Sequence, residues 1–482
     1  MRIEKDALGT LSLPDNVYYG VQTERARQNF AISGLTIGDH THFIWSLATI
    51  KMAAARANEE IGMLDRERSE AIQQAAREVM DGKFADQFPV DIFQGGGETS
   101  ANMNINEVVA NRANEILTGS KGNRKIHPNT HVNLGQSTND VIPSAVRMAC
   151  YLHLQTLEER LEFLAATLAR KKEQFADVVM AARTCLQDAV PITLGQEFSG
   201  YLAFVERQRK EGRRCSRDCL EIPLGATAVG TGLGAFAGYQ TAVYSHLKVI
   251  TGMPLRQDAN LFDGLQNGDV YIRISAYLKG LATGLAKLAH DLRLLASGPR
   301  AGFGEITLPA TQPGSSIMPG KVNPVIPEMI IQVSYQVCGH DLSISMAVEG
   351  GELDLNVWES LIMKCLFESF RLLNNSIVLF AERCIDGITA HTARCLEHAE
   401  SSIALVTILA PIFGYQQTVE VAQKAMAENK TIKATVMEMG LLADEEAEEL
   451  LNPKNLVDPV KCSQLLNRYV QQKRGLPSEK GN

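Results

Sequence analysis

The chain has 482 residues, of which 45% are hydrophobic and 21% are charged, and its net charge is −8 at pH 7. These values are typical of a globular protein and favour roughly two to four domains, or one long helical body. The negative balance argues against nucleic-acid binding, which requires a basic face. It leaves room for an anionic small molecule, since a few local cations can select an anion against the overall sign.

The ends of the chain and its cysteines indicate a cytoplasmic protein. The sequence opens on charged residues with no apolar stretch behind them, so we expect no signal peptide. No window of about 18 apolar residues suggests a membrane span. The nine cysteines are scattered, which favours free thiols in a reducing compartment. Cys215 and Cys219 have a spacing that could hold a metal, but no third ligand follows, and we expect no metal site.

Residues 1–139 are mixed in pattern and rich in turn signals, and we assign them to an N-terminal domain. Two stretches in this domain concentrate glycine, hydroxyl and amide residues, namely Gln94–Asn104 and Gly135–Asp140. Such clusters often cap helices, and the second could simply start the helix that follows. His127 and His131, like His40 and His42 before them, have ligand-like spacing without acidic partners, which favours packing or surface roles.

Residues 140–393 carry long helices and form the predicted central bundle domain. Two leucine stripes repeat at alternating steps of three and four residues, the pattern of helices that pack at shallow angles; they are Leu154, Leu157, Leu161, Leu164 and Leu168, and Leu278, Leu281, Leu285, Leu288, Leu292 and Leu295. Ser297-Gly-Pro299 should end the second helix. Further helices are expected at about 325–347 and 360–385. Period-two alternation is rare, so the sequence predicts an all-α fold.

Two more segments of this domain invite a functional interpretation. Arg183–Asp188 is a third polar stretch. Gly230–Ala235 fits a dinucleotide-binding pattern, but no strand and helix of a βαβ unit surround it, so we expect close backbone packing there and no bound cofactor. Residues 394–482 are predicted to form a small C-terminal helical domain. Within it, the acidic run 444–449 should be the solvated face of a helix, and 473–482 a charged tail.

The fourth polar stretch, Gly314 to Pro324, reads Gly-Ser-Ser-Ile-Met-Pro-Gly-Lys-Val-Asn-Pro. A carboxylate-rich substrate needs many neutral donors, glycines that let the backbone approach, and one compensating cation. This loop contains all three within eleven residues, and its prolines and glycines give it the profile of a bounded, movable lid. Together, the four stretches predict one polar pocket assembled from distant parts of a helical scaffold.

The fourth stretch resembles the signature of the aspartase/fumarase superfamily. The likeness extends to residues 2–10, 17–23, 86–91, 102–108, 225–233 and 291–302, which are most similar to the aspartase branch. The resemblance implies an all-α fold of three domains with a central long-helix bundle. It also implies a homotetramer whose active sites are each built from three subunits, and a reaction that needs no metal or organic cofactor.

The resemblance further implies a mechanism. Ser315 would be the general base that removes a proton from the carbon next to a carboxylate, and the carbanion would be stabilised as an aci-carboxylate. The carboxylate that takes up this charge would be bound by Thr99, Ser137, Thr138 and Ser316. Thr184, Lys321 and Asn323 would hold the other carboxylate, with Asn139 near the leaving group and Met318 shaping the pocket.

Two positions depart from the family pattern. Position 185 is Cys where class II fumarases have His, and a thiol is a poor proton shuttle at neutral pH. Cys185 therefore favours an ammonia-lyase, whose leaving group can depart already protonated; the residue itself would be a small space-filler beside the pocket. Position 98 is Glu where relatives usually have Gly. Glu98 would either recognise an ammonium or larger basic group on the substrate, or face solvent.

Three functions follow from these residues. The first is reversible elimination of ammonia from L-aspartate to give fumarate, acting on a small dicarboxylate or amino-acid substrate. The second is the same chemistry on malate, as a fumarase, or on an N-substituted aspartate, for which Glu98 is the motive. The third is a catalytically silent helical scaffold, against which the intact Ser315, Lys321 and Asn323 argue.

Overall fold

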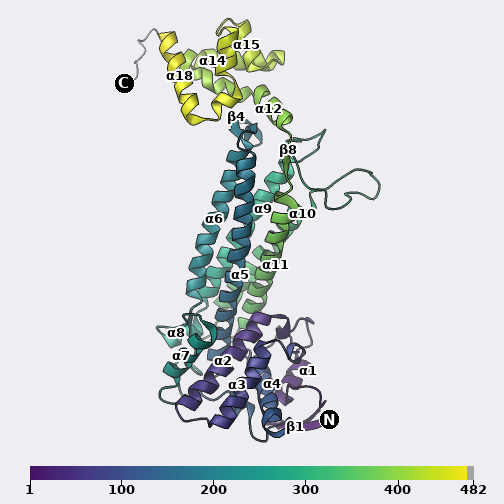
Figure 1. The fold of residues 1–482 in the computed structure, drawn as a ribbon, viewed down its shortest axis with the longest axis vertical. Coiled ribbons are helices and arrows are strands. Elements are labelled where there is room, and N and C mark those ends of the chain that lie inside the picture. The colour runs from purple at the N-terminus through teal and green to yellow at the C-terminus, as the bar shows by residue number, and fades with distance from the viewer. Residues whose placement is uncertain (475–482) are drawn as a thin grey trace. The chain divides into compact units, whose positions relative to one another are not determined.

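The computed structural model describes residues 1–474, and helices dominate it (Figure 1). The chain divides into two compact units, each made of three segments. The first unit comprises residues 1–160, 208–283 and 332–375, and the second comprises 161–207, 284–331 and, within the described chain, 376–474. Five long helices contribute residues to both units: α5 (Thr138–Gln174), α6 (Leu194–Asp218), α9 (Asp269–Leu295), α10 (Val325–Glu349) and α11 (Glu359–Phe380).

The first unit surrounds the buried helix α2 (Thr41–Glu60), which packs against α3 (Arg66–Met80) and α7 (Tyr239–Thr251). Next to these lies α4 (Thr99–Thr118), in contact with α3 and α1 (Val21–Asn29). The antiparallel hairpin β1 (Arg2–Asp6) and β2 (Gly9–Leu13) pairs Arg2 with Leu13. Shorter elements complete the unit: η1 (Ile37–Asp39), η2 (Ala85–Gln87), η3 (Pro128–Val132), β5 (Glu221–Ile222), β6 (Arg256–Gln257) and α8 (Leu261–Gln266).

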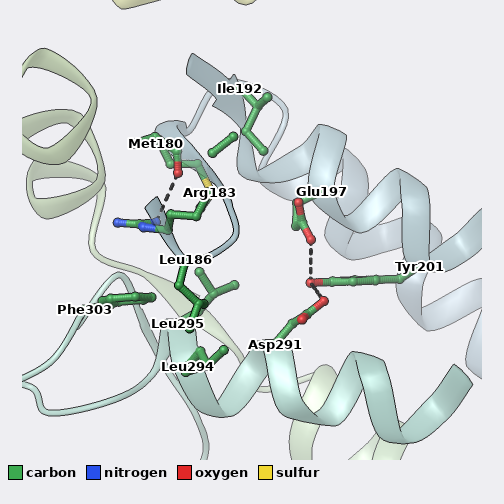
Figure 2. Close-up of a pocket in the computed structure, with 12 residues that line it drawn as sticks. Met180, Arg183, Leu186, Ile192, Glu197, Tyr201, Asp291, Leu294, Leu295 and Phe303 are labelled. Carbon is green, nitrogen blue, oxygen red and sulfur yellow. Dashed lines mark hydrogen bonds between the residues drawn. The ribbon is translucent and has the colours of Figure 1, made fainter. Parts of the chain in front are cut away.

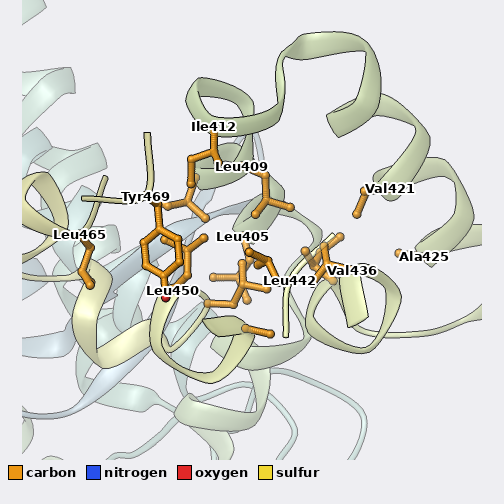
Figure 3. Packing of buried hydrophobic residues seen from close by; sticks show 14 residues of the cluster. Leu405, Leu409, Ile412, Val421, Ala425, Val436, Leu442, Leu450, Leu465 and Tyr469 are labelled. Atoms are coloured by element: carbon orange, nitrogen blue, oxygen red, sulfur yellow. The ribbon is translucent and has the colours of Figure 1, made fainter. Parts of the chain in front are cut away.

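The second unit contains a hairpin, β3 (Val179–Thr184) with β4 (Gln187–Thr193), and a small sheet of β7 (Ile306–Thr307) with β8 (Thr389–Ala390). Its C-terminal part is a set of short helices around their own apolar core, in which Leu405, Leu409, Val436, Leu450 and Tyr469 are buried (Figure 3). These helices are η5 (Ile403–Leu409), α13 (Ala410–Phe413), α14 (Tyr415–Glu428), α15 (Ile432–Glu438), α16 (Asp444–Leu450), α17 (Pro453–Leu456) and α18 (Pro459–Arg474), and they follow η4 (Ala381–Ile385) and α12 (Thr392–Ser401) in the chain.

The helical predictions are confirmed. Every leucine of the two stripes is buried, with the most exposed, Leu295, at 7%. Helix α9 ends at Leu295, two residues before the predicted terminator begins at Ser297. Helix α10 covers the predicted helix 325–347, and α11 together with η4 covers the predicted helix 360–385. Close helix packing is visible at Gly284, where any Cβ would overlap the ring of Phe204. The expectation of few strands also holds, because the four sheets have only two strands each.

The boundaries 139/140 and 393/394 remain predictions, since the two compact units cut across them. Most of the predicted tail, residues 475–482, lies outside the described part of the chain. Within residues 1–474, no single helix combines the length and apolarity needed to cross a membrane; Thr392–Ser401 and Ile403–Phe413 reach that threshold only as a pair bent by 58°.

Candidate active site

The first two predicted segments lie in the first unit, at the N-termini of α4 and α5. Thr99 is the first residue of α4; its side chain is exposed and its Oγ1 donates to the carbonyl of Gly96 at 2.9 Å. Helix α5 begins at Thr138, so the polar cluster 137–140 does start a helix. Asp140 caps it by accepting the Ser137 N–H at 2.9 Å.

A hydrogen bond joins these two helix starts. The Thr138 Oγ1 accepts from the Asn102 Nδ2 at 3.1 Å, which places the second turn of α4 against the first residue of α5. Asn139 donates its Nδ2 to the carbonyl of Ala228 at 2.7 Å. Thr99, Ser137, Thr138 and Asn139 therefore belong to one braced cluster of helix N-termini, where backbone N–H groups and helix dipoles favour an anion.

Lys51 lies directly behind this cluster and was not singled out from the sequence. It is fully buried in α2, and its Nζ donates to three amide oxygens: Asn102 at 2.8 Å, Gln136 at 2.9 Å and Asn133 at 3.1 Å. No carboxylate lies within ion-pair distance of Lys51 in the described chain. Burial lowers the Lys51 pKa to about 7. A lysine in an alanine-rich, otherwise apolar stretch was the available signal.

Asp140 is the buried counterpart of this lysine. Its Oδ2 accepts the N–H groups of Gly225 at 2.9 Å and Thr227 at 3.0 Å, which ties the loop before α7 to the start of α5. Burial raises the Asp140 pKa to about 6, while these N–H donors and the charge of Lys51 favour its ionised form. Asp140 thus positions the neighbouring hydroxyls through backbone contacts.

Glu98 corrects a prediction, because it does not face solvent. Its side chain is only 1% exposed, and its Oε1 accepts the backbone N–H of Ser360 at 2.6 Å together with the Ser360 hydroxyl. It therefore caps the first turn of α11 from another part of the chain. Glu98 also adopts φ 59°, a left-handed conformation that glycine takes more easily.

The carboxyl of Glu98 interacts electrostatically with a second buried carboxyl, that of Glu359. Glu359 accepts a hydrogen bond from the Tyr271 hydroxyl at 2.9 Å. Burial raises the pKa of both glutamates, and the charge of Glu98 raises that of Glu359 further. Two carboxyls in this arrangement hold at least one proton more firmly than exposed glutamates do. The side chain of Glu98 is thus engaged with α11, and a direct contact with substrate has no support in this geometry.

In the second unit, the Gly314–Pro324 loop holds its serine in a specific way. The Ser315 Oγ accepts two backbone N–H groups, from Met318 at 3.0 Å and from Ile317 at 3.2 Å. Two donors on one hydroxyl oxygen stabilise negative charge there, so they lower the cost of forming an alkoxide. The same two contacts also fix the turn of residues 315–318.

The base of the loop is closed by Gly314. Its N–H donates to the carbonyl of Lys321 at 2.7 Å, and its carbonyl accepts from the Asn323 Nδ2 at 2.7 Å. A Cβ at this position would lie 2.6 Å from the Lys321 carbonyl oxygen, so only glycine fits. Ser315, Met318 and Lys321 line one hollow of about 420 Å³ inside the loop. Ser316 is exposed on the same loop.

Thr184 and Cys185 lie at the tip of the β3–β4 hairpin. Thr184 pairs with Gln187, and the two residues between them, Cys185 and Leu186, have φ values of 53° and 59°, as in a type I′ turn. Both Thr184 and Cys185 are exposed. Within residues 1–474, no hydrogen bond links the Thr184 side chain with the loop that carries Ser315.

Next to the tip of this hairpin, Arg183 lines a cavity together with Phe303, Tyr201 and Asp291 (Figure 2). Arg183 pairs with the fully buried Glu305 at 2.6 Å, and its guanidinium lies 4.4 Å from the ring centroid of Phe303. A small cavity of about 110 Å³ beside it contains Tyr201, whose hydroxyl lies 2.8 Å from Glu197 and 3.0 Å from Asp291. These interactions orient the hairpin, and the neighbouring Thr184 with it.

The remaining sequence signals have structural roles. Cys215 and Cys219 are buried, and burial raises the pKa of the Cys215 thiol to about 11. His127 and His131 brace η3, since the His131 Nδ1 accepts the His127 N–H at 2.9 Å. Gly230–Ala235 lies in the loop before α7. Among residues 1–474, no group of three or more His, Cys, Asp or Glu side chains is placed to hold a metal ion.

Comparison with protein families gives two matches. Residues 9–339 match a family described as lyase, and residues 405–458 match one described as the fumarase C C-terminus. The first match covers more than half of the chain. Together they span parts of both compact units.

Individual proteins agree with these families. An aspartate ammonia-lyase from Bacillus sp is 46% identical over 460 residues, which cover 95% of this chain and 98% of that protein. The crystal structure of fumarate lyase:delta crystallin from Brucella melitensis, bound to cobalt, has a TM-score of 0.92 at 43% identity, and covers 95% of this chain and 100% of that one. A class II fumarase from Schistosoma mansoni has a TM-score of 0.92 at 34% identity, with coverages of 95% and 99%.

Proposed function

The chain belongs to the aspartase/fumarase superfamily of lyases and is a carbon–nitrogen lyase, and from that premise we propose that it eliminates ammonia from L-aspartate to give fumarate. The single observation that carries the chemistry is the Ser315 hydroxyl held by two backbone N–H groups, in a loop whose hollow it shares with Lys321. The similarity to aspartate ammonia-lyases supports the choice of substrate.

In the proposed reaction, the alkoxide form of Ser315 takes the proton from the substrate carbon that lies next to a carboxylate, and the amino group of the substrate is in its ammonium form. The electron pair moves into that carboxylate, which becomes the aci-carboxylate dianion. The pair then returns to form the carbon–carbon double bond, the carbon–nitrogen bond breaks, and ammonia leaves. The proton stays on Ser315 until it passes to solvent, so the atoms and charges balance without an additional reactant.

The donors at the helix starts suit the dianion. Thr99, Ser137 and Thr138, with Ser316 from the loop, would donate to the carboxylate that takes up charge, and each such donor is worth roughly 10²–10³ in rate. Lys51 adds positive potential from behind Thr138 when it is protonated. Lys321, Asn323 and Thr184 would bind the other carboxylate, Asn139 would lie near the departing ammonia, and Met318 would shape the pocket.

We further propose that the complete site is assembled in a homotetramer in which each site takes residues from three copies of the chain. The helix starts near Thr138 and the loop with Ser315 belong to different compact units, and the single chain shows no bond between Thr184 and that loop. Mixing an inactive Ser315→Ala protein with an inactive Thr138→Val protein should restore part of the activity, because hybrid tetramers contain some unaltered sites. Absence of any recovery after subunit exchange would contradict a shared site.

A hydratase acting on malate is the second candidate, favoured by the similarity to a class II fumarase. Cys185 separates the two, because it supplies no imidazole for protonating a hydroxide leaving group. The argument for an N-substituted aspartate as substrate rested on Glu98 as a binding residue. It is weakened because the Glu98 carboxyl accepts a hydrogen bond from Ser360. The nine cysteines are all free, which supports our assignment to the reducing cytoplasm.

The deciding experiment compares two substrates with the purified full-length protein. Fumarate release is followed by its ultraviolet absorbance with L-aspartate and with L-malate, and the reverse reaction is followed with fumarate and ammonium. We expect kcat/KM for aspartate to exceed that for malate by at least about 10³-fold, since the site is complementary to only one leaving group. Greater activity on malate would establish the hydratase, and activity on neither would overturn both proposals.

A further inference from the structure

A further cavity lies in the first unit, among residues that the proposed reaction does not use. It has a volume of about 260 Å³, and three elements meet around it: the N-terminus of α2, the middle of α5, and α11. The charged and titratable side chains that line it are Asp39, His40, His42, His153, Arg160 and Arg371. None of the four polar stretches contributes a lining residue.

The charge in this cavity is positive. Arg160 on α5 and Arg371 on α11 both line it, and neither has a carboxylate partner within ion-pair distance in residues 1–474. Asp39 is the acidic lining residue, and its Oδ2 already accepts from the backbone N–H of Thr36 at 2.7 Å and from the Thr36 hydroxyl at 3.1 Å. Two guanidinium groups with free donors are well suited to oxyanions.

A helix start adds to this preference. Helix α2, which has 20 residues, starts here with no acidic residue in its first turn and no side-chain cap, so its dipole and free N–H groups favour an anion. Asn374 also lines the cavity; its side chain is only 8% exposed, and its Oδ1 has no hydrogen-bond partner. This oxygen accepts hydrogen bonds, so it requires a donor, such as a water molecule that bridges it to the bound anion.

We propose that this cavity binds a small dianionic oxyanion, either a phosphate or a dicarboxylate, with Arg160 and Arg371 on its oxygens and the N-terminus of α2 beside it. A cavity of this volume accommodates an anion of this size together with water. The site is separate from the proposed active site in its residues, so it is a candidate for an effector and not for substrate turnover.

The histidines make this binding depend on pH. The His153 ring stacks on Phe370, with 5.1 Å between the ring centroids, and its centroid lies 4.6 Å from that of His42. Burial, together with the two neighbouring histidines, lowers the pKa of His153 to about 3. Burial also lowers the pKa of His40 and His42. An anion bound beside the rings would raise the pKa values of His40 and His42, so binding should take up protons, while His153 stays neutral between pH 6 and pH 8.

Other charges around the rings act in both directions. Asp39 and Glu368 raise the pKa of His40, whereas Arg371 lowers it. Glu368 is itself paired with Lys364 at 2.7 Å, which limits its influence. Arg160 adds a further cation from α5. The bound dianion would therefore be the main new negative charge that the histidines meet.

The test is calorimetric titration of the full-length protein with sulfate, whose charge stays at −2 between pH 6 and pH 8. We expect saturable binding that tightens several-fold from pH 8 to pH 6, with proton uptake revealed by two buffers of different ionisation enthalpy. Arg371→Gln and the exposed Arg160→Gln should each weaken binding at least tenfold. Arg66→Gln, at an exposed position of α3, should change binding by less than twofold, and aspartate turnover should be unchanged in all three variants.

The results decide the question in each case. Inorganic phosphate and succinate are then tested as competitors: displacement by phosphate identifies a phosphate-type ligand, displacement by succinate a dicarboxylate, and displacement by both supports the shared chemistry. The proposal would be overturned if sulfate did not bind, or if both arginine variants bound sulfate as tightly as the unaltered protein does. So would sulfate binding that is lost in Lys321→Met and kept in the arginine variants, because that sulfate would occupy the proposed active site.

Discussion

The two halves of the proposed site are held in opposite ways. Near Thr138, polar side chains from α2, α4 and α5 are buried and bonded to one another, with Lys51 and Asp140 inside the protein. Around Ser315, the loop is largely exposed and is held by its own backbone and by the amide of Asn323. The helix starts are therefore held by a buried hydrogen-bond network, whereas the Ser315 loop is exposed and is held mainly by bonds within itself.

This difference separates two tasks. Stabilising a dianion benefits from donors that need no rearrangement when charge develops, and a buried network fixes them in advance. Removing a proton requires a base that closes on the substrate and excludes water, which suits a loop that keeps its shape while it moves. Substitutions on the two sides should therefore fail in different ways.

The largest effect is expected on the loop side. Ser315→Ala removes the base, so kcat for aspartate should fall by about 10³-fold or more while KM changes little. Steady-state kinetics and gel filtration of the variant provide the measurement. Ile317→Val, a change to an exposed side chain of the same loop that does not line the hollow, should keep near-normal activity. Substantial turnover in the Ser315→Ala protein would remove that residue from its proposed role.

The receptor side should respond in binding as well as in rate. Lys51→Met removes the buried cation and leaves three amide oxygens without their donor, so we expect kcat/KM to fall by about 10–100-fold with a raised KM. Lys125→Met, at an exposed lysine paired with Glu67, is the matched control. A Lys51→Met enzyme with normal kinetics and a normal melting temperature would show that the cluster does not need this charge.

The buried glutamate pair predicts an effect on stability. Because Glu98 and Glu359 have raised pKa values, their contribution to stability is complete below the ordinary value of 4.5 and is lost as pH rises through neutrality. Glu98→Gln keeps an acceptor for Ser360 and removes that loss, so it should gain about 1–3 kcal/mol relative to the unaltered protein between pH 5 and pH 8.

Thermal melts across that pH range measure the effect, with Glu67→Gln as an exposed control that should show no change in slope. Parallel curves for Glu98→Gln and the unaltered protein would mean that the pair does not titrate there. Activity on aspartate should survive this substitution, because the Glu98 carboxylate contacts α11 and the variant preserves that contact.

The smallest effect is expected at the hairpin tip. Cys185→Ser should change kcat/KM for aspartate by less than about threefold, since an ammonia-lyase needs no proton shuttle there. The thiol is exposed, so labelling with a maleimide reports its accessibility in the assembled protein. A large loss of activity in Cys185→Ser would give this residue a direct part in the reaction.

The bundle could be predicted because leucine spacing encodes it locally: each stripe defines one helix face whatever it packs against. The loop could also be recognised, since its chemistry is concentrated in eleven consecutive residues. Lys51 and Glu98 could not, because their roles depend on burial and on partners far away in sequence, such as Asn133 and Ser360. Spacing cannot distinguish a charged residue that faces solvent from one turned into the interior.

The closure at Gly314 has a consequence for timing. Since its N–H and carbonyl tie it to Lys321 and Asn323, any movement of the loop carries the serine, its two N–H donors and the lysine as one body. In the proposed reaction, the Ser315 oxygen and the charge of Lys321 would therefore reach the substrate in the same event.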